Sequence, residues 1–271
     1  MPRRHFHDLP AEARRAIADK AGPVRDARTA EGGLNSGIAA FIETGHGTVF
    51  VKGIPTDHTQ APAQRREAAI NPHLPRACPR LYWHIEAGGD LLGYEVLNGR
   101  HADYAPGSSD LPLVAEAIAD LQDVVAPTDI AIKQAEERWA AYAPAGTAAF
   151  FAGTTLLHTD LAPHNVLIDD QAHIIDWAWP TRGAAWIDPA VLILRLLEAG
   201  HTLASAATFA SRFPSWRAAP MEAVQAFTAA NASLWAEIAR TDEAPWKTAM
   251  ARHAAAFDTY MRDAPETRRE V

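Results

Sequence analysis

Two aspartates and an asparagine stand close together in the middle of the chain. Asn165 follows Asp160 by five residues, and Asp176 follows Asn165 by eleven. A carboxylate beside a hydroxyl accepts the proton that the hydroxyl loses on becoming a nucleophile. Carboxylate and amide oxygens are ligands that suit Mg²⁺. The set is therefore typical of phosphoryl transfer from a Mg²⁺-bound nucleotide to a hydroxyl, with Asp160 as the catalytic base or as the group that orients that hydroxyl.

The residues between Asn165 and Asp176 predict how these side chains come together. Apolar runs at 166–168 and 173–175 flank a polar turn at 169–171, which is the pattern of a short β-hairpin. Such a hairpin would return Asp176 to the pocket that the loop from Asp160 to Asn165 faces. We therefore expect Asn165 to bind Mg²⁺ through its amide oxygen and Asp176 to link Mg²⁺ to the phosphates.

The first third of the chain is expected to be rich in strands. Turn residues at 44–47 and 87–90 interrupt alternating, β-branched stretches, as they do in hairpins. The expected strands lie within 37–52, at 81–86 and at 91–97. A first helix is expected at 8–20, with Asp8 as its cap, and a second at 61–70.

Beyond residue 98 the apolar residues recur at the spacing that is typical of helices. Asp110 would cap a helix whose apolar face is made by Leu111, Val114, Ile118 and Leu121. Further helices are expected at 130–142, 189–199, 203–211, 220–240 and 243–263. Strands followed by helices predict an α+β fold with two lobes, residues 1–97 and 98–271.

Composition excludes several classes of protein. The 271 residues are 48% hydrophobic and 21% charged, as in ordinary soluble globular proteins. We find no apolar run of about 18 residues, so no membrane span is expected. The first residues lack the apolar core of a secretory signal, and the single cysteine, Cys78, has no internal partner for a disulfide. These features favour the cytoplasm.

The negative charge of the chain is concentrated in its second part. Residues 98–271 hold 13 Lys and Arg against 22 Asp and Glu, a net charge of −9, whereas residues 1–97 carry a net charge of +1. Nucleic acid is therefore not an expected partner. A cationic small molecule would be attracted to this part. The plainer alternative is that the acids solvate a helical surface.

The central motif carries a resemblance to a known family. His158-Thr159-Asp160, Asn165 and Ile175-Asp176-Trp177 resemble the aminoglycoside phosphotransferase family, a branch of the protein-kinase-like fold. The family usually has Gly at the position of Thr159, and Trp177 is typical of its small-molecule kinases rather than of protein kinases. The resemblance covers about residues 30–200. It implies a bilobal fold with a β-rich N-lobe, an α-rich C-lobe and ATP bound between the lobes.

The resemblance implies further functional residues upstream of the motif. A lysine should end a strand and hold the α- and β-phosphates of the nucleotide, and Lys52 ends the alternating stretch from Thr48. A glutamate on the next helix should pair with that lysine. Glu67 is the only acid between Asp57 and Glu86, so we expect it to be this partner.

Two backbone segments should contact the nucleotide. A glycine-rich loop should precede Lys52, and residues 31–37 lie in that place without matching Gly-x-Gly-x-x-Gly, so a plain β-turn is the alternative. The phosphate-binding residues of this loop would be Gly32, Gly33, Asn35 and Ser36. In the hinge, the resemblance implies that the Glu95 carbonyl and the Leu97 N–H face the adenine.

Several other residues are expected to support the structure. Asp188 matches a family aspartate that begins a helix, and we expect it to cap that helix and brace the catalytic loop. His158 should pack and hydrogen-bond, whereas His164 would lie at the surface or near the substrate. Five tryptophans follow the motif, and most should belong to the core, with one or two available to stack on an acceptor.

The resemblance and the motif together predict an ATP- and Mg²⁺-dependent small-molecule O-phosphotransferase. The preferred acceptor is an aminoglycoside or another antibiotic, as in a resistance or self-resistance kinase. The first alternative is a metabolite kinase for choline, homoserine or a sugar, because one fold serves many substrates. An inactive, nucleotide-binding relative is the alternative from another class, although Lys52, Asp160, Asn165 and Asp176 are all present.

Overall fold

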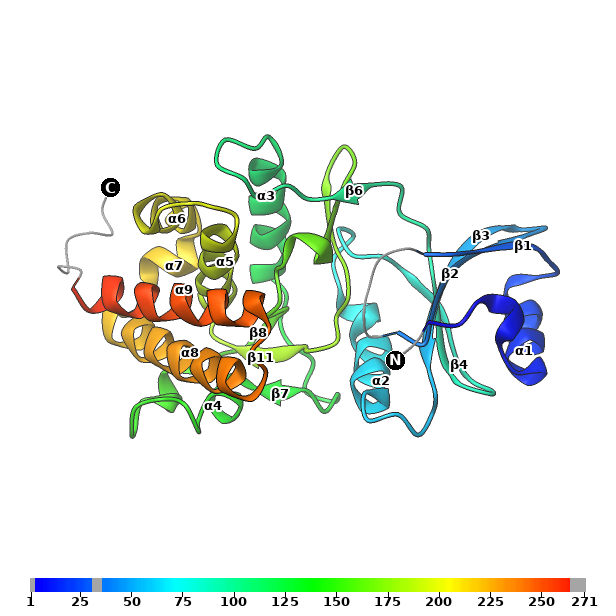
Figure 1. Cartoon of the computed structure of the whole chain (residues 1–271), viewed down its shortest axis with the longest axis horizontal. Helices are drawn as coiled ribbons and strands as arrows, with labels where there is room; N and C mark the ends of the chain where they lie inside the picture. Colours follow the sequence, from blue (N-terminus) through cyan, green and yellow to red (C-terminus); the bar gives the residue numbers. More distant parts are fainter. Residues whose placement is uncertain (1–2, 31–35, 264–271) are drawn as a thin grey trace. The chain divides into compact units, whose positions relative to one another are not determined.

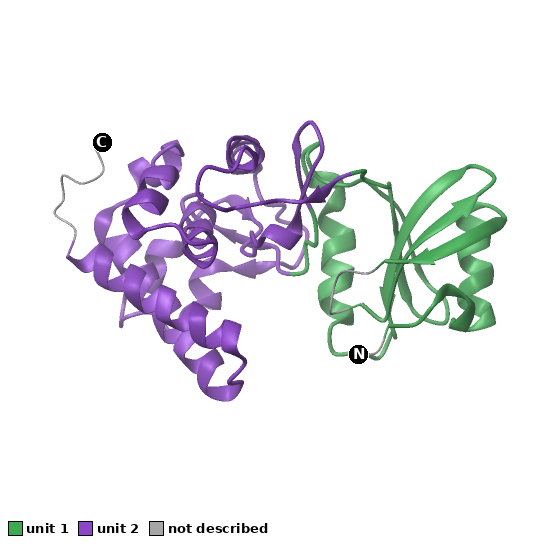
Figure 2. Cartoon of the chain, turned by 45° about the horizontal axis from the view of Figure 1, so that its top comes forward, with its two compact units in different colours: residues 1–98, 175–178 green, residues 99–174, 179–271 purple. Residues whose placement is uncertain are grey.

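The computed structural model describes residues 3–30 and 36–263 of the chain. The chain forms two compact units (Figure 2). Unit 1 contains residues 1–98 and 175–178, and unit 2 contains residues 99–174 and 179–271. Gly32, Gly33 and Asn35 of the expected glycine-rich loop lie outside the described residues.

Unit 1 is built on a five-stranded antiparallel sheet with the order β1-β2-β3-β5-β4. The strands are β1 (Val24–Thr29), β2 (Ile38–Thr44), β3 (Gly47–Ile54), β4 (Leu81–Glu86) and β5 (Asp90–Tyr94). The expected strands around both turns are present. The sequence did not predict β1, because this edge strand carries no buried residue and therefore lacks an apolar alternation.

Two helices cover the sheet of unit 1 on opposite faces, α1 (Ala11–Ala21) and α2 (Ala61–Ile70) (Figure 1). Val49 and Val51 of β3 join the core beneath α1, whereas Phe50 between them packs in the cluster beneath α2. This alternation gives Lys52 the same face as Phe50. The expected cap of the first helix is wrong, since Asp8 lies in a short 3₁₀ turn and α1 follows Pro10.

Unit 2 contains two small sheets of three strands each, with the orders β10-β9-β6 and β7-β11-β8. The strands are β6 (Arg100–His101), β7 (Lys133–Gln134), β8 (Thr155–Leu157), β9 (Val166–Ile168), β10 (Ala172–Ile174) and β11 (Thr181–Gly183). The antiparallel pair of β9 and β10 is the hairpin expected after Asn165.

The rest of unit 2 is mainly helical (Figure 1). Its helices are α3 (Asp110–Gln122), α4 (Ala135–Arg138), α5 (Ile187–Glu198), α6 (Leu203–Ala210), α7 (Pro214–Ala218), α8 (Met221–Thr241) and α9 (Pro245–Arg262). Within residues 3–30 and 36–263, no helix is both long enough and apolar enough to cross a membrane.

Two predictions for unit 2 are wrong. The helix expected over 130–142 is replaced by β7 and the short α4, because the backbone of β7 pairs with β11 instead of bonding within a helix. Asp110 begins α3 but gives it no side-chain cap. Its carboxylate instead binds the Arg100 guanidinium and accepts the backbone N–H of Asp103.

Gly93 of β5 provides a test of packing in unit 1. A Cβ atom at this position would overlap the indole of Trp83 on β4. We expect Gly93→Ala to lower the free energy of unfolding by about 1–3 kcal/mol, measured by urea denaturation. The loss should be smaller in a Trp83→Ala background, and Gly45→Ala, with 3.6 Å to its nearest neighbour, is the control. Equal losses in both backgrounds would contradict this account.

Candidate active site

Lys52 lies at the centre of an ion-pair cluster in unit 1. Its Nζ is 2.7 Å from Oε1 of Glu67 on α2 and 2.9 Å from Oδ1 of Asp176. Glu67 also accepts a 2.9 Å hydrogen bond from the phenol of Tyr94. The contact expected between Lys52 and Glu67 is therefore present, and it joins β3 to α2.

The two carboxylates determine the charge state of Lys52. Burial lowers the pKa of Lys52, but the charges of Asp176 and Glu67 raise it by more, so it lies above its ordinary value. Its ammonium group is charged at neutral pH, and its side chain keeps 13% of its surface exposed. It can therefore reach an anion while Glu67 holds its position.

Asp176 has a backbone conformation that few residues other than glycine adopt. Its φ is 63°, in the left-handed region, at a cost of about 1–2 kcal/mol. The next residue, Trp177, is buried, and its side chain lies beside the thiol of Cys78. Burial raises the pKa of that thiol to about 12, so Cys78 is an inert packing partner. The buried indole offsets the strain at Asp176 and leaves the carboxylate at the surface.

In unit 2 a buried carboxylate holds the start of the loop from His158 to Asn165. Asp188 accepts hydrogen bonds from the backbone N–H groups of His158 and Thr159, both at 2.8 Å. Burial raises the pKa of Asp188, while these two hydrogen bonds act in the opposite direction. The expected bracing role is present, but the expected capping role is wrong, because Asp188 makes no cap bond at α5.

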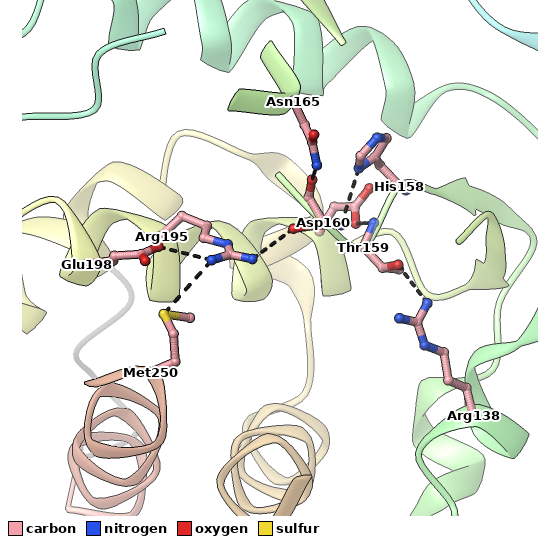
Figure 3. A network of polar contacts seen from close by, with 9 residues as sticks. Arg138, His158, Thr159, Asp160, Asn165, Arg195, Glu198 and Met250 are labelled. Atoms are coloured by element: carbon pink, nitrogen blue, oxygen red, sulfur yellow. Dashed lines mark hydrogen bonds and ion pairs between the residues drawn. The ribbon is translucent and has the colours of Figure 1, made fainter. Parts of the chain in front are cut away.

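Asp160 is held on three sides (Figure 3). Its N–H donates to Nδ1 of His158 at 3.2 Å, and its carbonyl accepts from the Asn165 amide at 3.0 Å. Its Oδ1 accepts a 2.8 Å hydrogen bond from Nη2 of Arg195 on α5. The carboxylate nevertheless remains 37% exposed. Buried His158 thus has the structural role expected of it, and Asp160 is presented to solvent.

Sequence reasoning missed Arg195. Its signal is nevertheless present, because Arg195 and Asp188 are the only charged residues between 187 and 197, a stretch that is otherwise apolar. A charged residue within a buried helical run needs a partner, since an unpaired charge is costly to bury. Its partner in the structure, Asp160, lies 35 residues earlier in the chain.

The side-chain amide of Asn165 is held by one hydrogen bond. It lies in a 3₁₀ turn, Pro163–Asn165, and is buried. Because its amide nitrogen donates to the Asp160 carbonyl, its amide oxygen remains to act as a ligand. Asp176 in unit 1 supplies a carboxylate. Both groups are hard oxygen donors, so the residues fit Mg²⁺. His164, next to Asn165, is exposed.

Thr159 stands where the family that the sequence resembles usually has glycine, and its side chain is hydrogen-bonded. Its φ is 66°, again left-handed. Its Oγ1 accepts a 2.6 Å hydrogen bond from Arg138, which also donates to Oγ1 of Thr181 at 2.7 Å. Burial lowers the pKa of Arg138 to about 10, although the charges of Asp188 and Asp160 oppose this. Thr159 thus gives the guanidinium a polar partner.

The other expected site residues lie outside regular elements. The strand expected to reach Leu97 ends at Tyr94, and Glu95 and Leu97 follow it half-buried. Glu95 still donates its N–H to the Arg80 carbonyl. Ser36 precedes β2 and is half-buried. Among the tryptophans, Trp186 and Trp216 belong to the core, whereas Trp179 and Trp246 are exposed.

Comparisons with known proteins identify the fold. No protein-family model and no curated protein matches the sequence. Choline kinase LicA from Streptococcus pneumoniae is similar in structure, with a TM-score of 0.63, 13% identity and coverage of 91% of this chain and 97% of that chain. Aminoglycoside phosphotransferase APH(4)-Ia is similar with a TM-score of 0.62 and 14% identity. The match covers 93% of this chain and 99% of that chain. A putative fructosamine-3-kinase from Haemophilus somnus 129PT is similar with a TM-score of 0.59 and 15% identity. The match covers 93% of this chain and 98% of that chain.

These similarities confirm the predicted α+β, kinase-like fold. They extend over nearly the whole of this chain and of each matched chain. Nucleotide complexes are known among the matches. LicA has been solved with AMP, and a thermostable mutant of APH(4)-Ia has been solved with AMP-PNP and hygromycin B.

The hydrogen bond between Arg138 and Thr159 can be tested with a matched pair of variants. Thr159→Val keeps the shape of the side chain but removes the acceptor for the guanidinium. We expect it to lower the free energy of unfolding by about 1–3 kcal/mol, measured by urea denaturation. Thr159→Ser keeps the hydroxyl and should cost less than about 1 kcal/mol. Equal losses would show that the hydroxyl contributes nothing.

Proposed function

We propose that this protein is an ATP-dependent phosphotransferase that phosphorylates a hydroxyl group of a small molecule. The observation that carries the proposal is the state of Asp160, whose backbone is fixed by His158 and Asn165 while its carboxylate stays accessible. A base must be oriented and also reachable by its substrate. The kinase-like fold supports the same conclusion.

The nucleotide is proposed to bind through Lys52. Its charged ammonium is fixed by Glu67 and would contact the α- and β-phosphates. We propose that the backbone of Glu95 and Leu97 binds the adenine. The loop containing Gly32, Gly33, Asn35 and Ser36 would cover the phosphates. The AMP and AMP-PNP complexes of proteins with this fold support ATP as the donor.

Asn165 and Asp176 are the residues that would hold Mg²⁺. Their amide and carboxylate oxygens match its preference for hard ligands. When bound, Mg²⁺ neutralises charge on the phosphates that are being transferred. Lys52 contacts Asp176 directly, so the ammonium would also fix the orientation of this carboxylate.

The reaction uses Asp160 as the proton acceptor. The oxygen of the acceptor hydroxyl forms a bond with the γ-phosphorus of ATP while its proton passes to Oδ2 of Asp160. The bond between that phosphorus and the bridging oxygen breaks, and ADP leaves with the bond electrons. Lys52 binds the phosphates throughout. Positioning and charge neutralisation supply most of the rate enhancement.

The proposed acceptor is a cationic alcohol, with an aminoglycoside or another antibiotic as the first choice. The net charge of −9 on residues 98–271 would attract such a molecule. Hygromycin B is bound in an aminoglycoside phosphotransferase of this fold. The match to a choline kinase favours a metabolite kinase as the second candidate, and choline is also a cationic alcohol.

A panel of acceptors tests the function. Aminoglycosides, choline and other amino alcohols, sugars and nucleosides are incubated with the protein, Mg²⁺ and ATP labelled at the γ-phosphate. We expect a phosphate monoester of a cationic acceptor, formed in equal amount to ADP. Asp160→Asn should lower kcat by about 10²–10⁴-fold because it removes the base.

The controls separate chemistry from binding. Asp160→Asn should keep the KM for ATP within about threefold, since Asp160 is not proposed to bind the nucleotide. Asp120→Asn, an exposed substitution on α3, should leave kcat unchanged. A fully active Asp160→Asn variant would exclude Asp160 as the base. If the protein binds Mg²⁺-ATP and transfers phosphate to no acceptor, it is an inactive relative.

A further inference from the structure

We infer that Arg195 is a positioning residue for the base Asp160, an inference that rests on the proposed transfer reaction. Arg195 lies in the last turn of α5, and its side chain is only 12% exposed. A surface ion pair usually contributes little to stability, because both side chains are mobile and solvated. Arg195 is shielded from most of the solvent and is hydrogen-bonded through both Nη atoms, so its role is better explained by the orientation of its partner.

The guanidinium of Arg195 is held at one end and binds Asp160 with the other (Figure 3). Nη1 donates to Oε2 of Glu198 at 3.0 Å and contacts Sδ of Met250 at 4.0 Å. Nη2 donates to Oδ1 of Asp160 at 2.8 Å. The group is planar and rigid, so fixing Nη1 also fixes the direction of Nη2. Glu198 on α5 and Met250 on α9 thereby determine where Asp160 is bound.

The rest of the loop cannot orient this carboxylate. The backbone of the loop is bound by Asp188, His158 and Asn165. These bonds fix the position of the Asp160 main chain but leave its side chain free to rotate. Within the part of the chain that the structure describes, Arg195 is the only hydrogen-bond donor to the carboxylate, and it binds Oδ1 alone. Oδ2 is left for the proton of the acceptor hydroxyl.

The surroundings strengthen this contact. Tyr104 is buried, and burial raises the pKa of its phenol, with Arg195 acting against this change and Asp160 adding to it. The charges of Arg195 and Asp160 therefore both influence the pKa of a phenol that is shielded from solvent. Charge-assisted hydrogen bonds are stronger where water is excluded. Arg195 thus restrains Asp160 on the side that faces the protein, and the exposed side remains for the acceptor.

The test compares two arginine variants of unit 2 in the phosphotransfer assay. Arg195→Ala should lower kcat by about 10- to 100-fold, because misplacing a reacting group by about 1 Å has an effect of this size. The KM for ATP should change by less than about twofold. Arg182→Ala is the control, since Arg182 is also half-buried, but among the described residues its side chain hydrogen-bonds only to the Gly153 carbonyl. Arg195→Met, which keeps the packing of the stem, replaces Arg195→Ala if the latter unfolds.

A double-mutant cycle shows whether Arg195 acts through Asp160. Asp160→Ala combined with Arg195→Ala should be no slower than Asp160→Ala alone, because the group to be positioned is absent. Guanidinium at low millimolar concentration should raise the rate of Arg195→Ala and leave that of the double variant unchanged. Additive losses, a rate that guanidinium does not raise, or an Arg195→Ala enzyme as fast as Arg182→Ala would overturn the inference.

Failure of the proposed function has a different signature. If the wild-type protein transfers phosphate to no acceptor, the phosphotransferase proposal fails, and the contact is tested by ¹⁵N NMR of the Arg195 side chain. Asp160→Asn should then shift the Arg195 Nε–Hε signal, whereas Asp120→Asn should not. A signal unchanged by Asp160→Asn would overturn the positioning role independently of any activity.

Discussion

The loop that carries the proposed base, Asp160, depends on one buried carboxylate. Asp188 accepts the backbone N–H groups of His158 and Thr159 and so fixes two consecutive peptide units. The left-handed conformation of Thr159 turns the chain at this point, which brings the N–H of Asp160 to the ring of His158. Without Asp188 these two N–H groups would be buried without partners, and each would destabilise the fold by about 1–3 kcal/mol. A strained residue persists only where its surroundings impose it.

Each unit holds one aspartate of the proposed site in the same way. In unit 1, Lys52 contacts Asp176 and is anchored by Glu67. In unit 2, Arg195 contacts Asp160 and is anchored by Glu198. In both units, one cation lies between an anchoring glutamate and an aspartate of the proposed site, so it orients one oxygen of that aspartate. The choice of cation also fits the proposed roles, because lysine serves as a point charge for phosphates and arginine has a rigid planar fork.

The sequence predicted contacts and elements formed by residues that are near one another along the chain. The spacing of Asp160, Asn165 and Asp176 indicated the site, and the hairpin between them is present. The contact of Lys52 with Glu67 followed from a family pattern. Long-range partners were missed, because nothing in local spacing joins Arg195 to Asp160 or Arg138 to Thr159. The helix expected over 130–142 failed for a similar reason, since its strand β7 forms only by pairing with the distant β11.

Native-state hydrogen exchange tests most directly whether Asp188 holds the loop. In Asp188→Asn one carboxylate oxygen is replaced by an NH₂ group, which cannot accept an N–H bond. We predict that at least one of the two amides, of His158 or Thr159, exchanges about tenfold faster in this variant, while amides of α8 keep their protection. Phosphate transfer should fall in parallel. Unchanged protection of both amides in a folded Asp188→Asn protein would contradict the account.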